Sequence, residues 1–319
     1  MTPADLSRCV VRAVRCAVED GELSGEGAVP QRVVVERTRP GGVGEYATPV
    51  AFQIAKSAGR RPAEVADVLA RRLAGEPGIE RVEITGAGFL NFVLAPASAV
   101  RIVGAVRAGR YPLRGLAADV AVSGELRARL VRQAVARIEA VQGLPSLPYI
   151  PYIPNIAPVA QRDGDVVARY GAGAAAWAVL AVPARETPAF PATLLLQGEA
   201  SEFFRVRYAH DRACALVRNA ARLGFHPEAG EVDAPALLRV LADHPLVLEA
   251  AAHHRAPERL ARHLVELADA LLDFQYRVLP QGDEKPSAAH RARLALAEAA
   301  GTVLAGGLSL LGIDAPTRL

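Results

Sequence analysis

The second half of the chain limits the possible folds most, because apolar residues recur there at helical spacing from Ser201 almost to the last residue. The spacing predicts helices over residues 204–223, 233–242, 245–254, 257–278 and 287–304. Helices of this length bury their apolar faces by packing against one another in antiparallel order. Residues 201–319 are therefore expected to form an all-α helical bundle.

The first part of the chain mixes helical and extended patterns. Thr2, Pro3 and Asp5 form a helix start with a cap, a proline at the first helical position and an acidic residue soon after. Apolar stripes and β-branched runs then predict strands at residues 32–37, 81–85 and 89–94, and helices at 47–58, 62–74 and 96–108. This mixture predicts an α+β domain over residues 1–109.

A proline-rich region separates these two parts. A helix is predicted over residues 125–141 with Ser123 as its cap, and five prolines follow within residues 143–158. Three more prolines lie within residues 183–191. Proline fixes φ and lacks a backbone donor, so these runs resist helix and central strand. We therefore expect residues 110–200 to be a mostly α-helical linker region interrupted by loops.

The distribution of charge argues against a general, salt-driven nucleic-acid binder. The formal net charge is +3, and residues 198–319 carry 14 basic and 16 acidic side chains. A protein that binds mainly through phosphates normally carries a basic face or stripe. RNA binding by this chain would therefore depend on local patches, stacking and shape.

Other kinds of site find little support in the sequence. The three cysteines, Cys9, Cys16 and Cys214, form no CxxC pair, and no Cys/His spacing suits a metal, so we expect no metal and no cofactor. The start of the chain has no signal-peptide pattern, and the apolar stretch at residues 171–182 is too short to span a membrane. The sequence thus predicts a cytoplasmic protein with neither a membrane nor DNA as a partner.

Three stretches resemble the arginyl-tRNA synthetase family, in the order that the family has them. Residues 35–94 carry Glu-Arg-Thr-Arg-Pro, Gly-Glu-Tyr-Ala-Thr and Gly-Ala-Gly-Phe-Leu-Asn-Phe, and resemble the N-terminal additional domain that grips the tRNA elbow. Val-Arg-Tyr-Ala-His-Asp-Arg at residues 206–212 resembles the segment that opens the helical anticodon-binding domain called DALR. Residues 244–319 end much like the tail of such a synthetase. The resemblance implies the additional domain at residues 1–109 and a DALR-type domain at residues 201–319.

The resemblance fails at the class I catalytic core. Such a core needs a His-x-Gly-His motif against the ATP phosphates and a lysine-bearing loop that holds pyrophosphate. The first histidine of this chain is His210, and no lysine lies between Lys56 and Lys285. Residues 110–200 are also too few for a dinucleotide-type parallel sheet. The resemblance therefore implies a shortened linker in place of the core, and a non-catalytic protein that uses neither ATP nor arginine.

The candidates for contact with the tRNA elbow are Phe89, Asn91 and Tyr46. In the family, the aromatic residue that matches Phe89 stacks on a base of the D-loop, and the amide that matches Asn91 bonds the base edge. The alternative is that Phe89 belongs to the core and Asn91 is a polar residue at the end of a strand. Both lie on one predicted strand, two residues apart, and therefore face the same side.

The candidates on the anticodon side are basic or aromatic residues of the DALR-like region. They are Arg212, Arg255, Arg259, Arg262, Tyr276 and Arg277. For the arginines the alternative is a solvated helix face. The family usually has a Phe-Tyr pair near this tyrosine and a terminal Met, whereas this chain has Phe-Gln-Tyr-Arg and ends at Leu319. The resemblance thus implies stacking through Tyr276 more readily than fine reading of an arginine anticodon.

Three functions remain open from the sequence. The first is a non-catalytic tRNA-binding protein, with tRNA-Arg as one candidate ligand, that contacts the elbow and the anticodon stem. The second is the tRNA-binding subunit of a split arginyl-tRNA synthetase whose catalytic core is another chain. The third is a protein-interaction module built on former tRNA-binding domains, whose partner is another protein.

Overall fold

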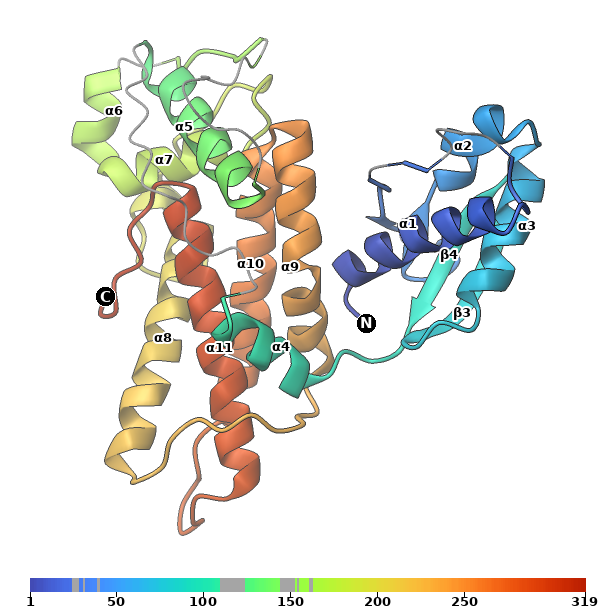
Figure 1. The fold of residues 1–319 in the computed structure, drawn as a ribbon. Coiled ribbons are helices and arrows are strands. Elements are labelled where there is room, and N and C mark those ends of the chain that lie inside the picture. The colour runs from blue at the N-terminus through green and yellow to red at the C-terminus, as the bar shows by residue number, and fades with distance from the viewer. Residues whose placement is uncertain are drawn as a thin grey trace. The chain divides into compact units, whose positions relative to one another are not determined.

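The computed structural model describes residues 1–24, 29–30, 32–38, 41–109, 124–143, 153, 155–160 and 163–319. These residues form two compact units, Met1–Ala97 and Ser98–Leu319 (Figure 1). The first unit combines helices with a small sheet, and the described elements of the second are helices. The predicted fold class, an α+β domain followed by a mostly helical region and an all-α bundle, is confirmed.

The first helix, α1 (Pro3–Glu19), begins as its sequence predicts. The Asp5 amide donates to Thr2 Oγ1 at 3.2 Å, and the Thr2 amide donates to Asp5 Oδ2 at 2.9 Å. These two bonds satisfy backbone donors that have no partner within the helix. Leu6 and Val10, on the predicted apolar stripe, are fully buried, so this stripe is the inner face of the helix.

Four antiparallel strands form the sheet of the first unit, in the order β1-β2-β4-β3. They are β1 (Glu36–Arg37), β2 (Tyr46–Thr48), β3 (Ile79–Thr85) and β4 (Phe89–Leu94). The chain passes from β2 to β3 through the helices α2 (Val50–Ala58) and α3 (Pro62–Leu73). Gly44 precedes β2 with a φ of 72°, and a Cβ there would lie 2.9 Å from the Phe92 carbonyl oxygen. Only glycine suits that close approach of the two strands.

The strand predicted at residues 32–37 is wrong in length, because only β1 at its end forms a ladder. Ser7 Oγ donates to the Val33 carbonyl oxygen at 2.7 Å, and Thr48 Oγ1 donates to the Val34 carbonyl oxygen at 2.7 Å. Side-chain hydroxyls therefore occupy the carbonyls that a neighbouring strand would have used.

The helix predicted at residues 47–58 is wrong at its start. Ala47 and Thr48 belong to β2, where they pair with Asn91 and Leu90 of β4. Thr48 precedes Pro49, and a proline disfavours the helical region for the residue before it. The helix therefore begins only after this proline, and the sheet gains the strand that carries Tyr46.

Helix α4 (Ala99–Arg107) begins later than the sequence predicted, because Ser98 is its cap. Ser98 Oγ donates to Glu231 Oε1 at 2.6 Å, and Arg107 forms an ion pair with Glu298 at 2.9 Å. Both acidic partners belong to the second unit. The helix therefore packs in that unit, whereas the sequence pattern placed it in a domain ending at residue 109.

The main part of the second unit is a bundle of α8 (Glu202–Arg222), α9 (Pro235–His254), α10 (Pro257–Phe274) and α11 (Ala288–Leu310) (Figure 1). A short 3-10 turn, η2 (Gln275–Arg277), follows α10. The prediction of two helices at residues 233–254 was wrong, because α9 continues through Pro245. This proline removes one helical hydrogen bond. Leu241 and Leu248, on either side of it, are fully buried, so packing holds both halves as one helix.

Shorter helices follow α4 along the chain and precede α8. They are α5 (Leu126–Val141), α6 (Asp163–Tyr170), α7 (Ala172–Leu180) and the 3-10 turn η1 (Ala192–Leu195). Arg127 of α5 is fully buried and donates to the carbonyl oxygens of Ala157 and Pro183 at 2.7 and 2.9 Å. It thereby ties two loops to α5. Glu125 is the residue before α5, whereas Ser123 and most of residues 143–158 lie outside the described residues.

The apolar stretch at residues 171–182 contains α7, and residues 174–180 of that helix are buried. Its apolar character therefore serves packing within the second unit. In the described part of the chain, every helix is too short or too polar to cross a membrane.

Candidate RNA interface

The aromatic ring of Phe89 lies at the surface of the first unit. Phe89 is 44% exposed, and its ring centroid is 4.9 Å from that of Phe52, which is 37% exposed. Phe89 opens β4 directly after a hairpin turn, and Phe52 lies on the outer side of α2. The two rings, tilted by 54°, form one exposed apolar surface. The alternative that Phe89 belongs to the core does not agree with this exposure.

Asn91 lies on the same face of β4 as Phe89 but is only 5% exposed. Its Nδ2 donates to Thr85 Oγ1 at 2.7 Å and to the Phe89 carbonyl oxygen at 3.4 Å. The second bond is long and therefore weak. The amide nitrogen of Asn91 is thus engaged inside its own domain.

Tyr46, the third elbow candidate, is buried. It is 4% exposed and lies in β2, where it pairs with Phe92 of β4. A ring enclosed in this way has no open face on which a base could stack. We therefore assign Tyr46 to the packing of the sheet and leave it out of the candidate interface.

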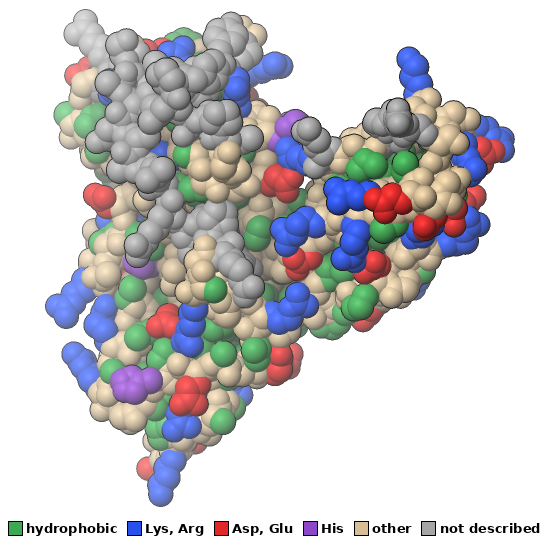
Figure 2. Space-filling view, viewed as in Figure 1, with side chains coloured by type: hydrophobic (Ala, Val, Ile, Leu, Met, Phe, Trp, Pro, Cys, Tyr) green, Lys and Arg blue, Asp and Glu red, His purple; other side chains and the backbone are tan. Residues whose placement is uncertain are grey.

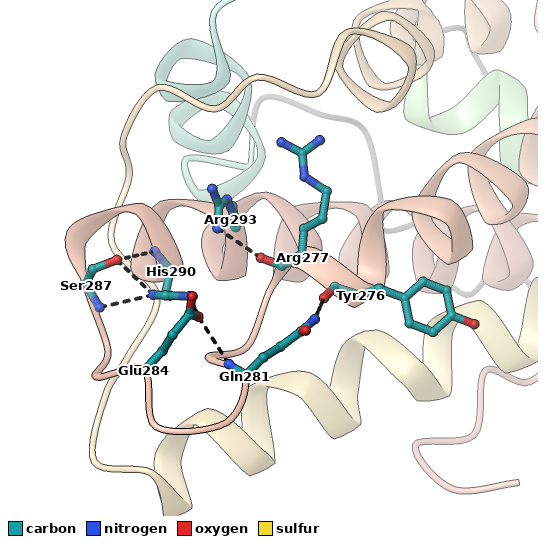
Figure 3. Close-up of polar contacts among 7 residues, drawn as sticks. All are labelled: Tyr276, Arg277, Gln281, Glu284, Ser287, His290 and Arg293. Atoms are coloured by element: carbon teal, nitrogen blue, oxygen red, sulfur yellow. Dashed lines mark hydrogen bonds and ion pairs between the residues drawn. The ribbon is translucent and has the colours of Figure 1, made fainter.

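On the second unit, Tyr276 is 71% exposed in η2, between α10 and α11. Its ring and the Arg277 side chain project from the turn in different directions (Figure 3). Gln281 Nε2 donates to the Tyr276 carbonyl oxygen at 2.8 Å, and Arg293 donates to the Arg277 carbonyl oxygen at 3.2 Å. Two side chains therefore hold the backbone of the turn, while the ring and the guanidinium remain exposed.

Further hydrogen bonds fix the loop that follows η2 (Figure 3). Glu284 Oε2 accepts from the Gln281 amide at 3.2 Å and lies 3.5 Å from His290 Nε2. His290 Nδ1 accepts from the Ser287 amide at 3.2 Å, at the capped start of α11. This series of contacts joins the loop to α11 and so supports the turn that carries Tyr276.

The arginine candidates divide into engaged and exposed side chains. Arg212 Nε donates to Gln275 Oε1 at 2.7 Å, and Arg255 pairs with Glu139 at 3.0 Å. These contacts join α8 to η2 and α9 to α5, so both arginines stabilise the second unit itself. The exposed candidates lie on α10 and in η2: Arg259, Arg262 and Arg277.

Basic and acidic side chains are interspersed over the face seen in Figure 2. Lys and Arg form no continuous stripe among the side chains shown there. This agrees with the near balance of charge in the sequence. Attraction for phosphate therefore depends on single exposed arginines more than on a broad field.

A buried histidine pair lies where α9 packs against α10. The ring centroids of His244 on α9 and His263 on α10 are 5.1 Å apart. Burial lowers the pKa of His244 well below 6.5, and the neighbouring His263 lowers it further. His244 is therefore neutral at pH 7 and belongs to the bundle core. Across the described residues, no three His, Cys, Asp or Glu side chains gather as a metal site requires.

Comparison with known proteins finds a matching domain family for each unit. Residues 6–94 match the arginyl tRNA synthetase N terminal domain, and residues 206–319 match the DALR anticodon binding domain. The chain is an arginyl-tRNA synthetase-like protein. The arginine–tRNA ligase of Frankia alni is 56% identical to it over 95 residues. Those residues are 30% of this synthetase-like chain and 17% of the relative.

Two solved structures resemble this synthetase-like chain. Thermus thermophilus arginyl-tRNA synthetase aligns over 100% of both chains with a TM-score of 0.58 and 15% identity. A putative arginyl-tRNA synthetase from Campylobacter jejuni covers 50% of this chain and 36% of its own, with a TM-score of 0.43 and 21% identity. At this level of identity, the Thermus structure supports the fold alone.

Phe52 and Gln281 of the synthetase-like chain were not predicted as functional residues from the sequence. Phe52 falls outside the buried stripe of α2, which consists of Val50, Ala51, Ile54, Ala55 and Ala58. An aromatic residue beside an apolar stripe is the signal that could have identified it. Gln281 has no such signal, because its contact depends on how the loop after η2 folds back.

Proposed function

We propose that this chain is a non-catalytic tRNA-binding protein that contacts the tRNA elbow with its first unit and the anticodon stem with its second. The observation that carries the proposal is the exposed ring of Phe89, on a domain of the arginyl-tRNA synthetase N-terminal type. An exposed aromatic ring offers a stacking face to any unpaired base. Phe52 enlarges this face, and Asn91 lies beside it.

The anticodon side of the proposal rests on Tyr276 and Arg277 in the DALR domain. Tyr276 has the exposure and the fixed backbone that stacking requires, and Arg277 supplies a cation from the same turn. Arg259 and Arg262 are exposed and suit phosphate contacts. Arg212 and Arg255 act as supporting residues, because their side chains are already engaged in the unit.

The non-catalytic part of the proposal rests on the residues that class I chemistry needs. No histidine precedes His210 and no lysine lies between Lys56 and Lys285, so nothing in that span stabilises the phosphates of ATP in the family's manner. We therefore expect binding of tRNA, with tRNA-Arg as one candidate, without its aminoacylation. ATP, arginine and metal ions are not ligands in this proposal.

Two measurements on the purified full chain test the proposal. Sequencing of the RNA that copurifies from the native host should return tRNA above its share of total RNA. Pyrophosphate exchange and arginine charging should stay at the level of a mock purification. Absence of tRNA, with no affinity for total tRNA in filter binding, would refute the binding role. Turnover that follows the protein peak through a second column would refute the non-catalytic role.

A second candidate function is favoured by a pair of exposed leucines. Leu195 at the end of η1 and Leu196 just after it are 50% and 51% exposed. Two adjacent exposed leucines offer an apolar contact to another protein. They support the tRNA-binding subunit of a split synthetase, in which a separate chain brings the catalytic core. Copurification of such a chain, lost on changing Leu195 and Leu196 to serine, would favour this candidate.

A further inference from the structure

Strand β3 is an edge of the small sheet, and part of its backbone faces outward. Within the described residues, β3 has β4 on one side and no strand on the other. Glu45, directly before β2, donates its amide hydrogen to the Phe92 carbonyl oxygen at 2.8 Å, so Phe92 turns its backbone groups away from β3. Val82 lies opposite Phe92, and the two therefore form a non-hydrogen-bonded pair of the ladder. Val82 thus turns its own N–H and C=O to the open edge.

The side chains on either side of Val82 carry opposite charges. Arg81 and Glu83 are accessible to solvent and form an ion pair with each other at 2.5 Å. Both point to the same face of the sheet, because side chains alternate along a strand. A run of like charges on an edge strand would repel an identical strand, whereas opposite charges do not. The stretch Arg-Val-Glu is therefore complementary to a second copy of itself that runs in the opposite direction.

These charges favour one register for a pair of identical strands. Outward-facing backbone groups must meet one another, so a two-fold axis passes through a residue position and not between two residues. An axis at Val82 sets Arg81 of each copy opposite Glu83 of the other copy. An axis at Arg81 or at Glu83 would set like charges against each other. With the axis at Val82, Arg81 and Glu83 form non-hydrogen-bonded pairs, in which opposed side chains come closest.

We propose that the β3 edge is a contact between two copies of this chain, which pair in antiparallel order about Val82 and make their two small sheets continuous. The two Val82 residues exchange backbone hydrogen bonds, and an Arg81–Glu83 pair lies on each side of them. A β-bulge between Ile79 and Arg81 interrupts the regular edge, so the ladder is short. A contact of this size gives a weak, reversible dimer. It involves the first unit alone and does not depend on RNA.

Analytical ultracentrifugation of the purified full chain tests the contact. The wild type should pass from monomer towards dimer as its concentration rises from about 5 to about 500 μM, the range of a weak interface. Arg81→Glu and Glu83→Arg each set like charges together in both cross-strand pairs and should weaken the dimer about 5- to 30-fold. The matched control is Arg239→Glu, which makes the same change of charge at an exposed position of α9 and should leave the dimer unchanged.

Mixing the two charge variants tests the register. An Arg81→Glu chain and a Glu83→Arg chain present opposite charges to each other at both cross-strand pairs. Their equimolar mixture should therefore dimerise as the wild type does, although each variant alone remains largely monomeric. The double variant Arg81→Glu/Glu83→Arg should dimerise as well. The urea midpoints of all these variants should match that of the wild type, because an exposed ion pair adds little to stability.

Hydrogen exchange locates the backbone contact. The Val82 amide faces the open edge of a single copy and should exchange more slowly at about 500 μM than at about 5 μM, because the dimer gives it an acceptor. The next amide, of Glu83, faces β4 in each copy, and its exchange should change little. Equal exchange of the Val82 amide at both concentrations, in a sample that dimerises, would overturn the proposal.

The other outcomes also decide the proposal. A wild type that stays monomeric at the highest concentration overturns it, and the edge is then open to solvent or to a strand of another protein. A dimer that neither single variant weakens overturns it too, because the contact then lies elsewhere, for example at Leu195 and Leu196. A mixture of the two variants that stays monomeric excludes the register about Val82 and with it the proposal. These measurements contain no RNA, so their result is independent of the proposed function.

Discussion

Replacing Phe89 with alanine distinguishes binding from packing, because this ring is 44% exposed in a strand where Phe92 is fully buried. Full burial of a phenylalanine side chain stabilises a fold by roughly 1.5–3 kcal/mol. Slightly more than half of Phe89 is covered, so Phe89→Ala should lower the free energy of unfolding by about 1–2 kcal/mol. A core phenylalanine replaced by alanine would instead cost about 3–5 kcal/mol.

The same substitution removes the stacking face for a base. Loss of one base–aromatic stack costs roughly 1–3 kcal/mol, or about 5- to 160-fold in Kd. Urea unfolding and tRNA affinity, measured on the same preparations and corrected for the folded fraction, report the two effects separately. Phe92→Leu is the matched control, because it lowers stability by about 1–2 kcal/mol without changing the exposed surface.

Two results would contradict this reasoning. If Phe89→Ala binds tRNA as the wild type does, per folded molecule, Phe89 has no stacking role and the interaction-module hypothesis becomes the leading one. If Phe92→Leu weakens binding as much as Phe89→Ala, the loss follows from stability and not from the ring. A loss of unfolding free energy in the core range for Phe89→Ala would contradict its exposure.

Three further predictions concern the second unit. Tyr276→Ala should weaken binding of an anticodon stem-loop by roughly 1–3 kcal/mol and change stability by less than about 0.5 kcal/mol; unaltered affinity in filter binding contradicts it. Arg127→Met leaves two half-buried carbonyl oxygens without their donor and should cost about 2–4 kcal/mol in urea unfolding; a cost below about 1 kcal/mol contradicts it. The pKa of His244 is lower in the folded than in the unfolded chain, so the unfolded chain binds a proton more readily. The free energy of unfolding is therefore unaffected by this histidine above about pH 6.5 and decreases as the pH falls from there towards the lowered pKa. His244→Leu should remove up to about 1.4 kcal/mol per pH unit from the slope of unfolding free energy below pH 6.5, and an unchanged slope in urea titrations at pH 5–7 contradicts this.

The start of the first helix was predictable from the sequence because its cap is local, although the equivalent cap at Ser98 was missed. Thr2, Ser201 and Ser287 each cap a helix through a backbone amide only a few residues away. The errors arose where distant residues decide. Pro245 reads as a helix boundary, yet buried leucines on both sides carry α9 through it. Residues 47–48 read as helix, yet their pairing with β4 depends on a strand more than forty residues away.

In the candidate site too, local sequence pointed to the residues, whereas their exposure and partners depend on distant parts of the chain. The family-like blocks drew attention to Phe89, but nothing in its sequence context separates an exposed ring from a buried one, and Phe92 of the same block is buried. Arg212 and Arg255 read as cations for RNA, yet their partners Gln275 and Glu139 lie 63 and 116 residues away. Spacing along one helix cannot reveal such partners. The sequence alone therefore does not distinguish an exposed arginine from one that is paired with a residue of another helix.

The ion pairs that many arginines of this chain form limit the kind of RNA that it could bind under the proposed function. Several are neutralised within their own unit, as in the ion pairs Arg72–Asp20, Arg107–Glu298 and Arg255–Glu139. Duplex RNA is bound mostly through phosphates and 2′-hydroxyls, and this balanced surface offers little to hold it. In the proposed function, the exposed rings of Phe89 and Tyr276 stack only on bases that are already unstacked. A transfer RNA presents such bases in its elbow loops and again in its anticodon loop, so its two unpaired regions suit the two exposed rings.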